Sequence, residues 1–128
     1  MNDVTYLPNP RVAVYGTLRK GGVNNHVLTK EAAGKHLGSF WTPPDYHMYD
    51  LGAYPAITLN GSHSILLEVY EVMYMGPIDT LEGYPDLYLR KAISTPYGPS
   101  WVYYMTKEEV NGSPVLSGNW MQHINAGE

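Results

Sequence analysis

The chain contains no cysteine, and charged residues make up only 16% of its 128 positions. The absence of cysteine excludes disulfides, thiolate nucleophiles and cysteine-bound zinc. The net charge is −4, and basic residues stand at most two in a row, at Arg19-Lys20 and Arg90-Lys91. Without a basic stripe for phosphates, no nucleic-acid partner is expected. No apolar run approaches the length of a membrane span, so no membrane partner is expected either.

Other familiar motifs are missing too. No pair among the five histidines has the spacing His-x-x-x-His or His-Glu-x-x-His, so no metal site is predicted. There is no Gly-x-Ser-x-Gly elbow of a serine hydrolase, and Gly21-Gly22 lacks the Lys-Ser/Thr ending of a phosphate loop. Residues 1–10 lack the basic-then-apolar pattern of a secretion signal. The cytoplasm is therefore the expected compartment, and no motif predicts an oligomeric state.

Tyrosine is what the chain has in abundance: twelve, against three tryptophans and one phenylalanine. Tyrosine suits pleated, half-buried surfaces and pocket walls, where the ring is dry and the hydroxyl finds a partner. A length of 128 residues, 44% of them hydrophobic, can bury a proper core. The expectation is one domain over residues 1–128, β-rich and with polar-edged cavities.

Short β-branched and aromatic runs predict more strands than helices. One helix is expected from Asn24 or Asn25 to Ala33, with Gly34 as its stop signal. A second is expected from Pro77 to Leu81, and residues 117–120 predict a last helical turn. Strands are expected at residues 11–15, 46–49, 56–59, 65–73, 88–95 and 101–106, with a surface loop at 108–114.

These elements predict an α+β fold around a mostly antiparallel sheet or a small barrel. Asn60-Gly61 lies between two apolar runs and predicts a hairpin that joins the strands at 56–59 and 65–73.

Two motifs carry the chemistry. Tyr15-Gly16-Thr17-Leu18 closes an apolar strand, and the N–H groups of residues 16–18, freed where the strand ends, can form a nest for a carboxylate. Gly16 would permit close approach of a ligand and an unusual φ. About sixty residues later, residues 79–85 place one carboxylate, Glu82, just before a turn. An anion-holding loop and one acid/base carboxylate can support proton transfer on a small zwitterion.

Together these motifs resemble those of the γ-glutamylcyclotransferase-like superfamily, which includes the γ-glutamylamine cyclotransferases and the AIG2-like proteins. The resemblance covers most of the chain. It rests on YGTLRKGGVNNH at residues 15–26, Tyr54-Pro55-Ala56, Val69-Tyr70-Glu71-Val72, the Asp-x-Leu-Glu-Gly-Tyr-Pro-x-x-Tyr-x-Arg of residues 79–90, and Gly118-Asn119-Trp120.

The resemblance implies a small β-barrel flanked by a few short helices and an intramolecular cyclisation. The α-amine of a γ-glutamyl amide attacks its own γ-carbonyl, which gives 5-oxoproline and a free amine. By position Glu82 is then the acid/base and the loop from Tyr15 to Leu18 cradles the glutamyl part. The partner is a small γ-glutamyl substrate and no cofactor is needed. The leaving amine stays open among amino acids, the ε-amine of lysine and polyamines.

This chemistry places demands on Glu82 and on the pocket around it. An ordinary glutamate is too weak a base near pH 7, so we expect a partly buried Glu82 whose neighbours Leu81 and Tyr84 favour its neutral form. Tyr15 and Tyr88 are expected to line the pocket, with hydroxyls available to the substrate.

Two other functions compete with the enzyme. The first is a binding module on the same fold that holds a small anion or zwitterion without turnover. The second is an interaction protein whose exposed aromatics, Trp101, Tyr103 and Tyr104, form a partner surface.

Plain structural roles are expected for the remaining candidates. Asp79 would serve the dipole of a short helix, and Arg90 would pair with a nearby acid. Glu68 and Glu71 would be charges on a sheet face, and His26 would tie down the start of the first helix by hydrogen bonds.

Overall fold

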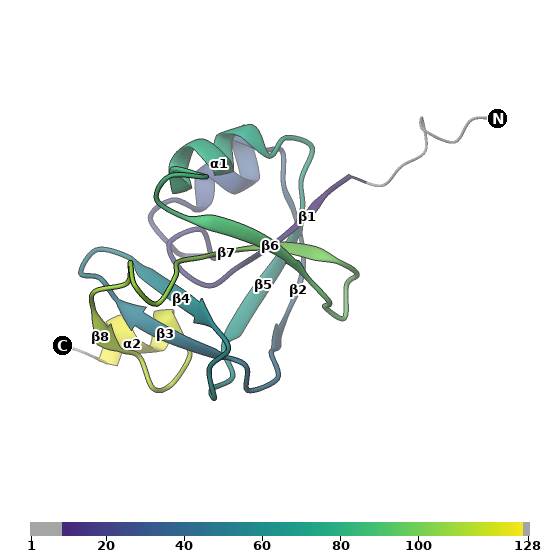
Figure 1. Ribbon diagram of the computed structural model, residues 1–128. Coiled ribbons are helices and arrows are strands. Elements are labelled where there is room, and N and C mark those ends of the chain that lie inside the picture. Colours follow the sequence, from purple (N-terminus) through teal and green to yellow (C-terminus); the bar gives the residue numbers. More distant parts are fainter. Residues whose placement is uncertain (1–8, 127–128) are drawn as a thin grey trace.

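The structure is a computed structural model that describes residues 9–126 (Figure 1). Residues 1–8 lie outside the described residues. The expectation that residues 1–10 carry no secretion signal therefore falls mostly outside the structure. The elements in chain order are β1 (Arg11–Val14), η2 (Val27–Glu31), β2 (Lys35–Trp41), β3 (Tyr46–Asp50), β4 (Pro55–Leu59), β5 (Leu66–Glu71), α1 (Gly76–Glu82), β6 (Leu89–Ile93), β7 (Ser100–Tyr104), β8 (Ser113–Pro114) and α2 (Trp120–Ala126).

The strands form two sheets. The larger has the order β2-β5-β1-β7-β6, and the smaller has the order β4-β3-β8. All pairs are antiparallel except β1 with β7, which run parallel. The two sheets meet where the Met105 N–H donates to the Ile57 carbonyl at 2.9 Å. The α+β class is confirmed, and within residues 9–126 the strand pairing yields two sheets without closing into one barrel.

Side chains of β1 point alternately to the two faces of the larger sheet, and each face packs against a different hydrophobic cluster. Val12 and Val14 face one hydrophobic cluster, where they meet Leu28 of η2 and Ile78 of α1. Ala13 and the following Tyr15 face a second cluster, formed with residues of β3, β4 and α2. Because β1 lies at the centre of the larger sheet, both of its faces are buried, as its apolar sequence requires. Figure 1 shows η2 and α1 together on one side and the smaller sheet with α2 on the other.

The first helix differs from its prediction. It is a short π-helix in which the Ala32 N–H donates to the Val27 carbonyl, five residues back, at 2.9 Å. The helix ends at Glu31, and Ala33, with φ 53°, is the left-handed residue that turns the chain, so the stop signal expected at Gly34 is one residue off. Gly34 follows, and its N–H donates to the Leu28 carbonyl at 2.8 Å. The role expected for His26 is wrong: its side chain is exposed and makes no capping hydrogen bond.

The six predicted strands are confirmed, with ends that shift by one or two residues. β2 has no counterpart among the predictions. It is an edge strand with a bulge between His36 and Gly38, where the Tyr97 hydroxyl packs on the glycine. The predicted loop at 108–114 ends in the short strand β8.

The hairpin predicted at Asn60-Gly61 is wrong, because β4 and β5 belong to different sheets. The Gly61 N–H donates to the Asp45 carbonyl at 2.8 Å, and His63 bridges to Tyr46. The segment after β4 therefore packs along β3 before the chain crosses to the larger sheet. Within residues 9–126, no helix has the length and apolar character needed to cross a membrane.

Candidate active site

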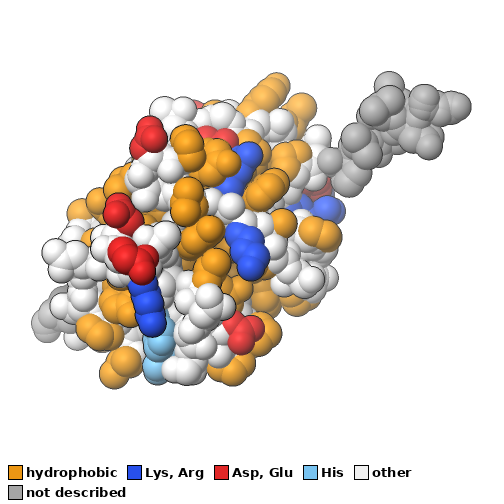
Figure 2. Space-filling view, viewed as in Figure 1, with side chains coloured by type: hydrophobic (Ala, Val, Ile, Leu, Met, Phe, Trp, Pro, Cys, Tyr) orange, Lys and Arg blue, Asp and Glu red, His pale blue; other side chains and the backbone are white. Residues whose placement is uncertain are grey.

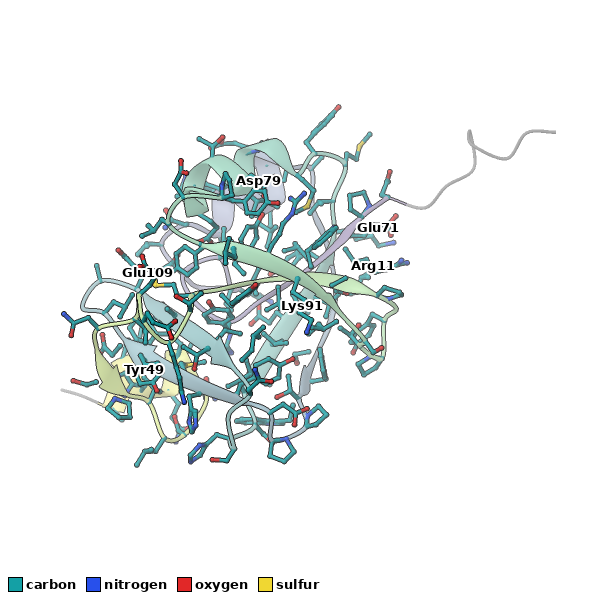
Figure 3. The ribbon with its side chains drawn as sticks, viewed as in Figure 1. Arg11, Tyr49, Glu71, Asp79, Lys91 and Glu109 are labelled. Atoms are coloured by element: carbon teal, nitrogen blue, oxygen red, sulfur yellow. The ribbon has the colours of Figure 1, made fainter. Side chains whose placement is uncertain are left out.

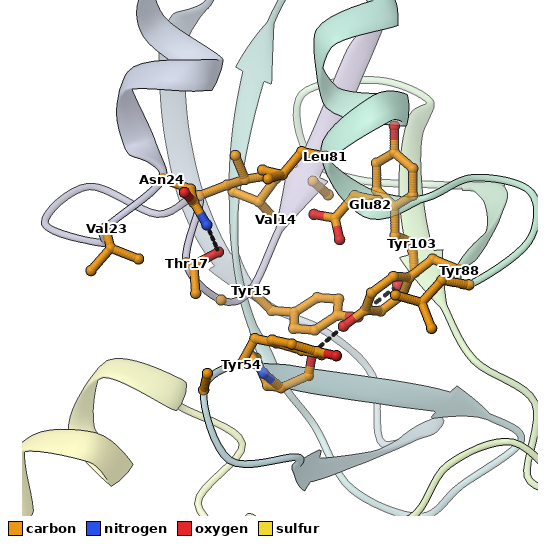
Figure 4. A pocket seen from close by; sticks show the side chains of 16 residues that line it. Val14, Tyr15, Thr17, Val23, Asn24, Tyr54, Leu81, Glu82, Tyr88 and Tyr103 are labelled. Carbon is orange, nitrogen blue, oxygen red and sulfur yellow. Dashed lines mark hydrogen bonds between the residues drawn. The ribbon is translucent and has the colours of Figure 1, made fainter.

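The structure brings all six residues of the predicted site to one open pocket of about 290 Å³ (Figure 4). Three sides come from separate parts of the chain: the loop after β1, the C-terminal end of α1, and the turn between β3 and β4. The site residues that line it are Tyr15, Gly16, Thr17, Leu18, Glu82 and Tyr88.

The backbone of the loop after β1 is free to bind a ligand. None of the hydrogen bonds found within residues 9–126 is donated by the N–H groups of Gly16, Thr17 or Leu18. The reason expected for Gly16 needs correction, because its φ is not among the left-handed values. Glycine is needed there because a Cβ would lie 2.7 Å from Cγ of Pro55. The tight packing of the loop on Pro55 sets one wall of the pocket.

A buried ion pair anchors the far end of the same loop. Arg19 Nε lies 3.0 Å from Glu68 Oε2 on β5, and the Lys20 N–H donates to Glu68 Oε1 at 2.8 Å. Arg19 also donates to the Asn119 side chain at 2.9 Å. The expected sheet-face role is therefore wrong for Glu68, which is buried, whereas Glu71 lies beside Arg11 where β1 begins (Figure 3).

Two asparagines hold the middle of the loop instead of capping the helix. The Asn24 amide donates to the Thr17 hydroxyl at 3.0 Å, and the Asn25 amide donates to the Leu18 carbonyl at 2.7 Å. Asn24 itself lines the pocket. Sequence reasoning assigned both asparagines to the start of the helix. Each stands seven residues after its partner in the loop, and this short spacing is a signal for a hydrogen bond back to the loop.

Glu82 ends α1 with its carboxylate pointing into the pocket, above the rings of Tyr15 and Tyr88 (Figure 4). Gly83 follows with φ 65°, which turns the chain away and leaves Glu82 at the wall. Glu82 is half-buried, and burial raises its pKa from 4.5 to about 7. No hydrogen bond or ion pair found within residues 9–126 involves this carboxylate. Of the described residues that line the pocket, it is also the one that carries a charge.

The surroundings of Glu82 match the expectation only in part. Leu81 lines the pocket beside it. Tyr84 does not line the pocket; its ring lies 4.6 Å from the Arg90 guanidinium instead. Leu87 also lines the pocket, which sequence reasoning did not predict, together with the rings of Tyr15 and Tyr88, which it did.

The tyrosine hydroxyls are committed to the protein. Tyr15 donates to the Tyr103 carbonyl at 2.8 Å and accepts from the Ile57 N–H at 3.3 Å. Tyr88 donates to the Pro55 carbonyl at 2.7 Å. Burial holds the pKa of both phenols above the usual value, so they stay neutral. The expectation that these hydroxyls are available to the substrate therefore needs correction: both donate within the protein, and the two tyrosines line the pocket.

A second ion pair fixes the helix that carries Glu82. Arg90 Nη1 lies 2.7 Å from both carboxylate oxygens of Asp79, which confirms that Arg90 pairs with an acid. Asp79 points from α1 toward the strands (Figure 3) and accepts the Tyr103 hydroxyl at 2.6 Å. Asp79 is in the first turn of α1, as expected, but its side chain is bound to β6 and β7. Since Tyr103 is buried, it cannot belong to an exposed partner surface.

Metal-binding groups do not gather in the residues that the structure describes: between 9 and 126, no cluster of three or more histidine, aspartate or glutamate side chains could hold an ion. The arrangement consists of free backbone donors on one wall and one unpartnered carboxylate on another. It can bind a small ligand with an anionic group and move a proton within it.

The comparisons with known proteins point to one family. Residues 12–122 match the model of the family described as gamma-glutamyl cyclotransferase, AIG2-like. A Vibrio cholerae protein, whose name assigns it provisionally to the gamma-glutamylcyclotransferases, is 40% identical over 115 residues, covering 88% of this chain and 96% of that protein.

Solved structures agree in fold. An uncharacterized protein of Pyrococcus horikoshii is similar with a TM-score of 0.74 and 26% identity, over 92% of this chain and 95% of the other. A mouse AIG2-like protein is similar with a TM-score of 0.71 and 21% identity, over 84% and 86% of the two chains. At that identity the mouse structure supports the fold alone.

Proposed function

This chain belongs to the gamma-glutamyl cyclotransferase, AIG2-like family, and from that premise we propose that it converts γ-glutamyl amides to 5-oxoproline and a free amine. Glu82 acts as general acid and base, and the nucleophile is the substrate's own α-amine. A five-membered ring closes readily if the glutamyl chain is held bent, because the attacking and attacked atoms then meet without further loss of freedom.

One observation carries the proposal: Glu82 projects into the pocket with a pKa of about 7, and its carboxylate has no hydrogen-bond or ion-pair partner among residues 9–126. A carboxyl group with that pKa is ionised in part and protonated in part at neutral pH. It can therefore accept a proton and return one within the same turnover.

The proton transfers balance within one site. The α-ammonium of the substrate gives one proton to Glu82, and the amine nitrogen then forms a bond to the γ-carbon. Glu82 returns the proton to the departing nitrogen as the amide C–N bond breaks. The second proton leaves the attacking nitrogen for solvent or for the free amine product, which ends as an ammonium. No cofactor takes part.

Binding rests on the loop after β1. The unbonded N–H groups of Gly16, Thr17 and Leu18 suit the α-carboxylate of the glutamyl group, because the part of the chain that the structure describes places no lysine or arginine at the pocket. The rings of Tyr15 and Tyr88 hold the glutamyl methylenes against the wall below Glu82.

The test is a turnover assay with a set of γ-glutamyl amides, measuring 5-oxoproline and free amine in equal amounts. Replacement Glu82→Gln should lower kcat by roughly 10²–10⁴-fold, the usual contribution of general acid–base catalysis. The matched control is Glu71→Gln, because Glu71 does not line the pocket. Full activity of Glu82→Gln would refute the role of this residue. A ligand that binds and is recovered unchanged, with no product from any amide, would favour the binding module.

A further inference from the structure

The mouth of the pocket is lined by apolar side chains that water reaches. Val23 is 78% exposed and Leu87 is 49% exposed, while Tyr54 and Leu81 are each 39% exposed. They come from the loop after β1, from the turn between β3 and β4, and from the end of α1 with the residues that follow it, and all four line the pocket. Exposed apolar groups that converge on one cavity indicate that part of a ligand covers them.

The charges needed for a polar leaving group are missing from this wall. Among the described residues that line the pocket, there is no lysine or arginine to pair with a carboxylate of a leaving amino acid. Arg19, at the far end of the loop after β1, is already paired with Glu68 at 3.0 Å. Between residues 9 and 126, no aspartate and no second glutamate line the pocket to pair with a cationic amine such as a polyamine.

On the face in Figure 2, hydrophobic side chains gather down the middle, with charged side chains of both signs beside them. Leu87 packs close to Gly83, directly after Glu82, so an apolar surface adjoins the residue proposed to protonate the departing nitrogen.

We propose that the leaving amine carries an uncharged, apolar substituent, and that the subsite of this substituent is formed by Leu81, Leu87 and Tyr54, with Val23 across the mouth. This inference rests on the proposed function and narrows it. An alkyl or aryl γ-glutamyl amide buries these side chains on binding, whereas γ-glutamyl-ε-lysine brings a zwitterionic end to a wall without charges. One extra or missing methylene alone changes specificity in an apolar pocket by about 10–200-fold, and a zwitterionic end group differs from an apolar one by more than a methylene.

The experiment compares γ-glutamylbenzylamide with γ-glutamyl-ε-lysine by two readouts. Turnover by the wild type reports the proposed function, and calorimetric binding to Glu82→Gln reports the subsite independently of turnover. We expect kcat/KM and affinity both to favour the benzylamide by at least about tenfold. Equal or weaker binding of the benzylamide, or no binding of either compound, would overturn the inference. A binding preference without 5-oxoproline would refute the cyclisation and leave the apolar subsite standing.

A pair of charge substitutions localises the effect. Leu87→Glu should remove most of the preference for the benzylamide and improve binding of the lysine compound. The control is Leu116→Glu, which changes an equally apolar, 73% exposed leucine that does not line the pocket. A preference unchanged in Leu87→Glu, or reduced as much by Leu116→Glu, would refute the assignment of this wall.

Discussion

Two glutamates occupy opposite surroundings in this small domain. Glu68, in the middle of β5, is 7% exposed and is held by Arg19 at 3.0 Å, by the Lys20 N–H at 2.8 Å and by the Tyr70 hydroxyl at 3.3 Å. Glu82, at the end of α1, is half-buried and meets no such partner within the described part of the chain, residues 9–126.

The comparison separates two effects on a carboxyl group: burial, and pairing with a cation and hydrogen-bond donors. Desolvation disfavours the charged form of a carboxyl group, and a nearby cation with hydrogen bonds offsets that cost. Glu68 has both compensations and therefore ties the loop after β1 to the sheet. Glu82 has neither, so its pKa rises to about 7 and its oxygens stay available for a ligand. Glu68 therefore holds the loop after β1 in place, whereas the carboxylate of Glu82 is available for proton transfer.

The largest effect is expected from breaking the pair at Glu68. Glu68→Gln leaves the Arg19 guanidinium buried without its counter-charge, and removing one partner of a buried pair costs about 3–5 kcal/mol. Urea unfolding at pH 7 should show this loss in the free energy of unfolding. Because the loop that holds residues 16–18 loses its anchor, KM for a γ-glutamyl amide should rise too.

The control for that change lies on the same strand. Glu71→Gln alters a partly exposed side chain, so its effect on stability should stay within about 0.5 kcal/mol. Equal effects of the two substitutions would show that the Arg19–Glu68 pair contributes nothing beyond an ordinary surface charge.

Glu82→Gln should shift stability in the opposite direction. The pKa of Glu82 is raised on folding, from 4.5 to about 7, so the unfolded chain ionises first as pH rises. The wild type therefore loses up to about 3 kcal/mol between pH 4.5 and 7 through this one group, and the loss is complete above pH 7. Glu82→Gln avoids the loss, so it should unfold at higher urea than the wild type at pH 8.

The pH dependence provides the check on this prediction. Below pH 4.5 both states of the wild type are protonated at Glu82, and the difference between the two proteins should vanish. A difference that stays constant from pH 4 to 8 would mean that burial of the charge is not its cause.

Much of the fold and of the site was predictable from local signals. The strand periodicity located six strands, and the order of the motifs placed Glu82 and the loop from Tyr15 to Leu18 together before any contact was known. Glu82 and the loop came together through the resemblance of their motifs to one family, whereas the strands depend on residues close together in the chain. The turn at Asn60-Gly61 was recognisable for the same reason, but which strands it joins depends on pairing in space.

What sequence reasoning missed depends on long-range contacts. β2 contains a bulge and an exposed edge, so its alternation is weak, and only pairing with β5 makes it a strand. The burial of Glu68 depends on Arg19, 49 residues away, and the tyrosine hydroxyls are used by carbonyls from distant strands. Glycine is needed at position 16 because Pro55 packs against it, and no pattern of neighbouring residues could reveal this contact.

The smallest effect is expected on the pH dependence of the rate, when Glu82 is given a cationic neighbour of the kind that Arg19 provides for Glu68. Leu87→Lys places an ammonium on the pocket wall beside Glu82, and a nearby cation favours the charged form of a carboxyl group. If Glu82 must be ionised to accept the proton, kcat/KM of the wild type rises through a midpoint near pH 7. In Leu87→Lys that midpoint should fall by about 1 pH unit, the low end for a charge within 4–6 Å, because this lysine is partly solvated.

The control is Leu116→Lys, which adds the same charge away from the pocket and should leave the midpoint in place. A midpoint that moves equally in both variants would assign the shift to net charge, and one that moves in neither would mean that the group titrating in the rate profile is not Glu82.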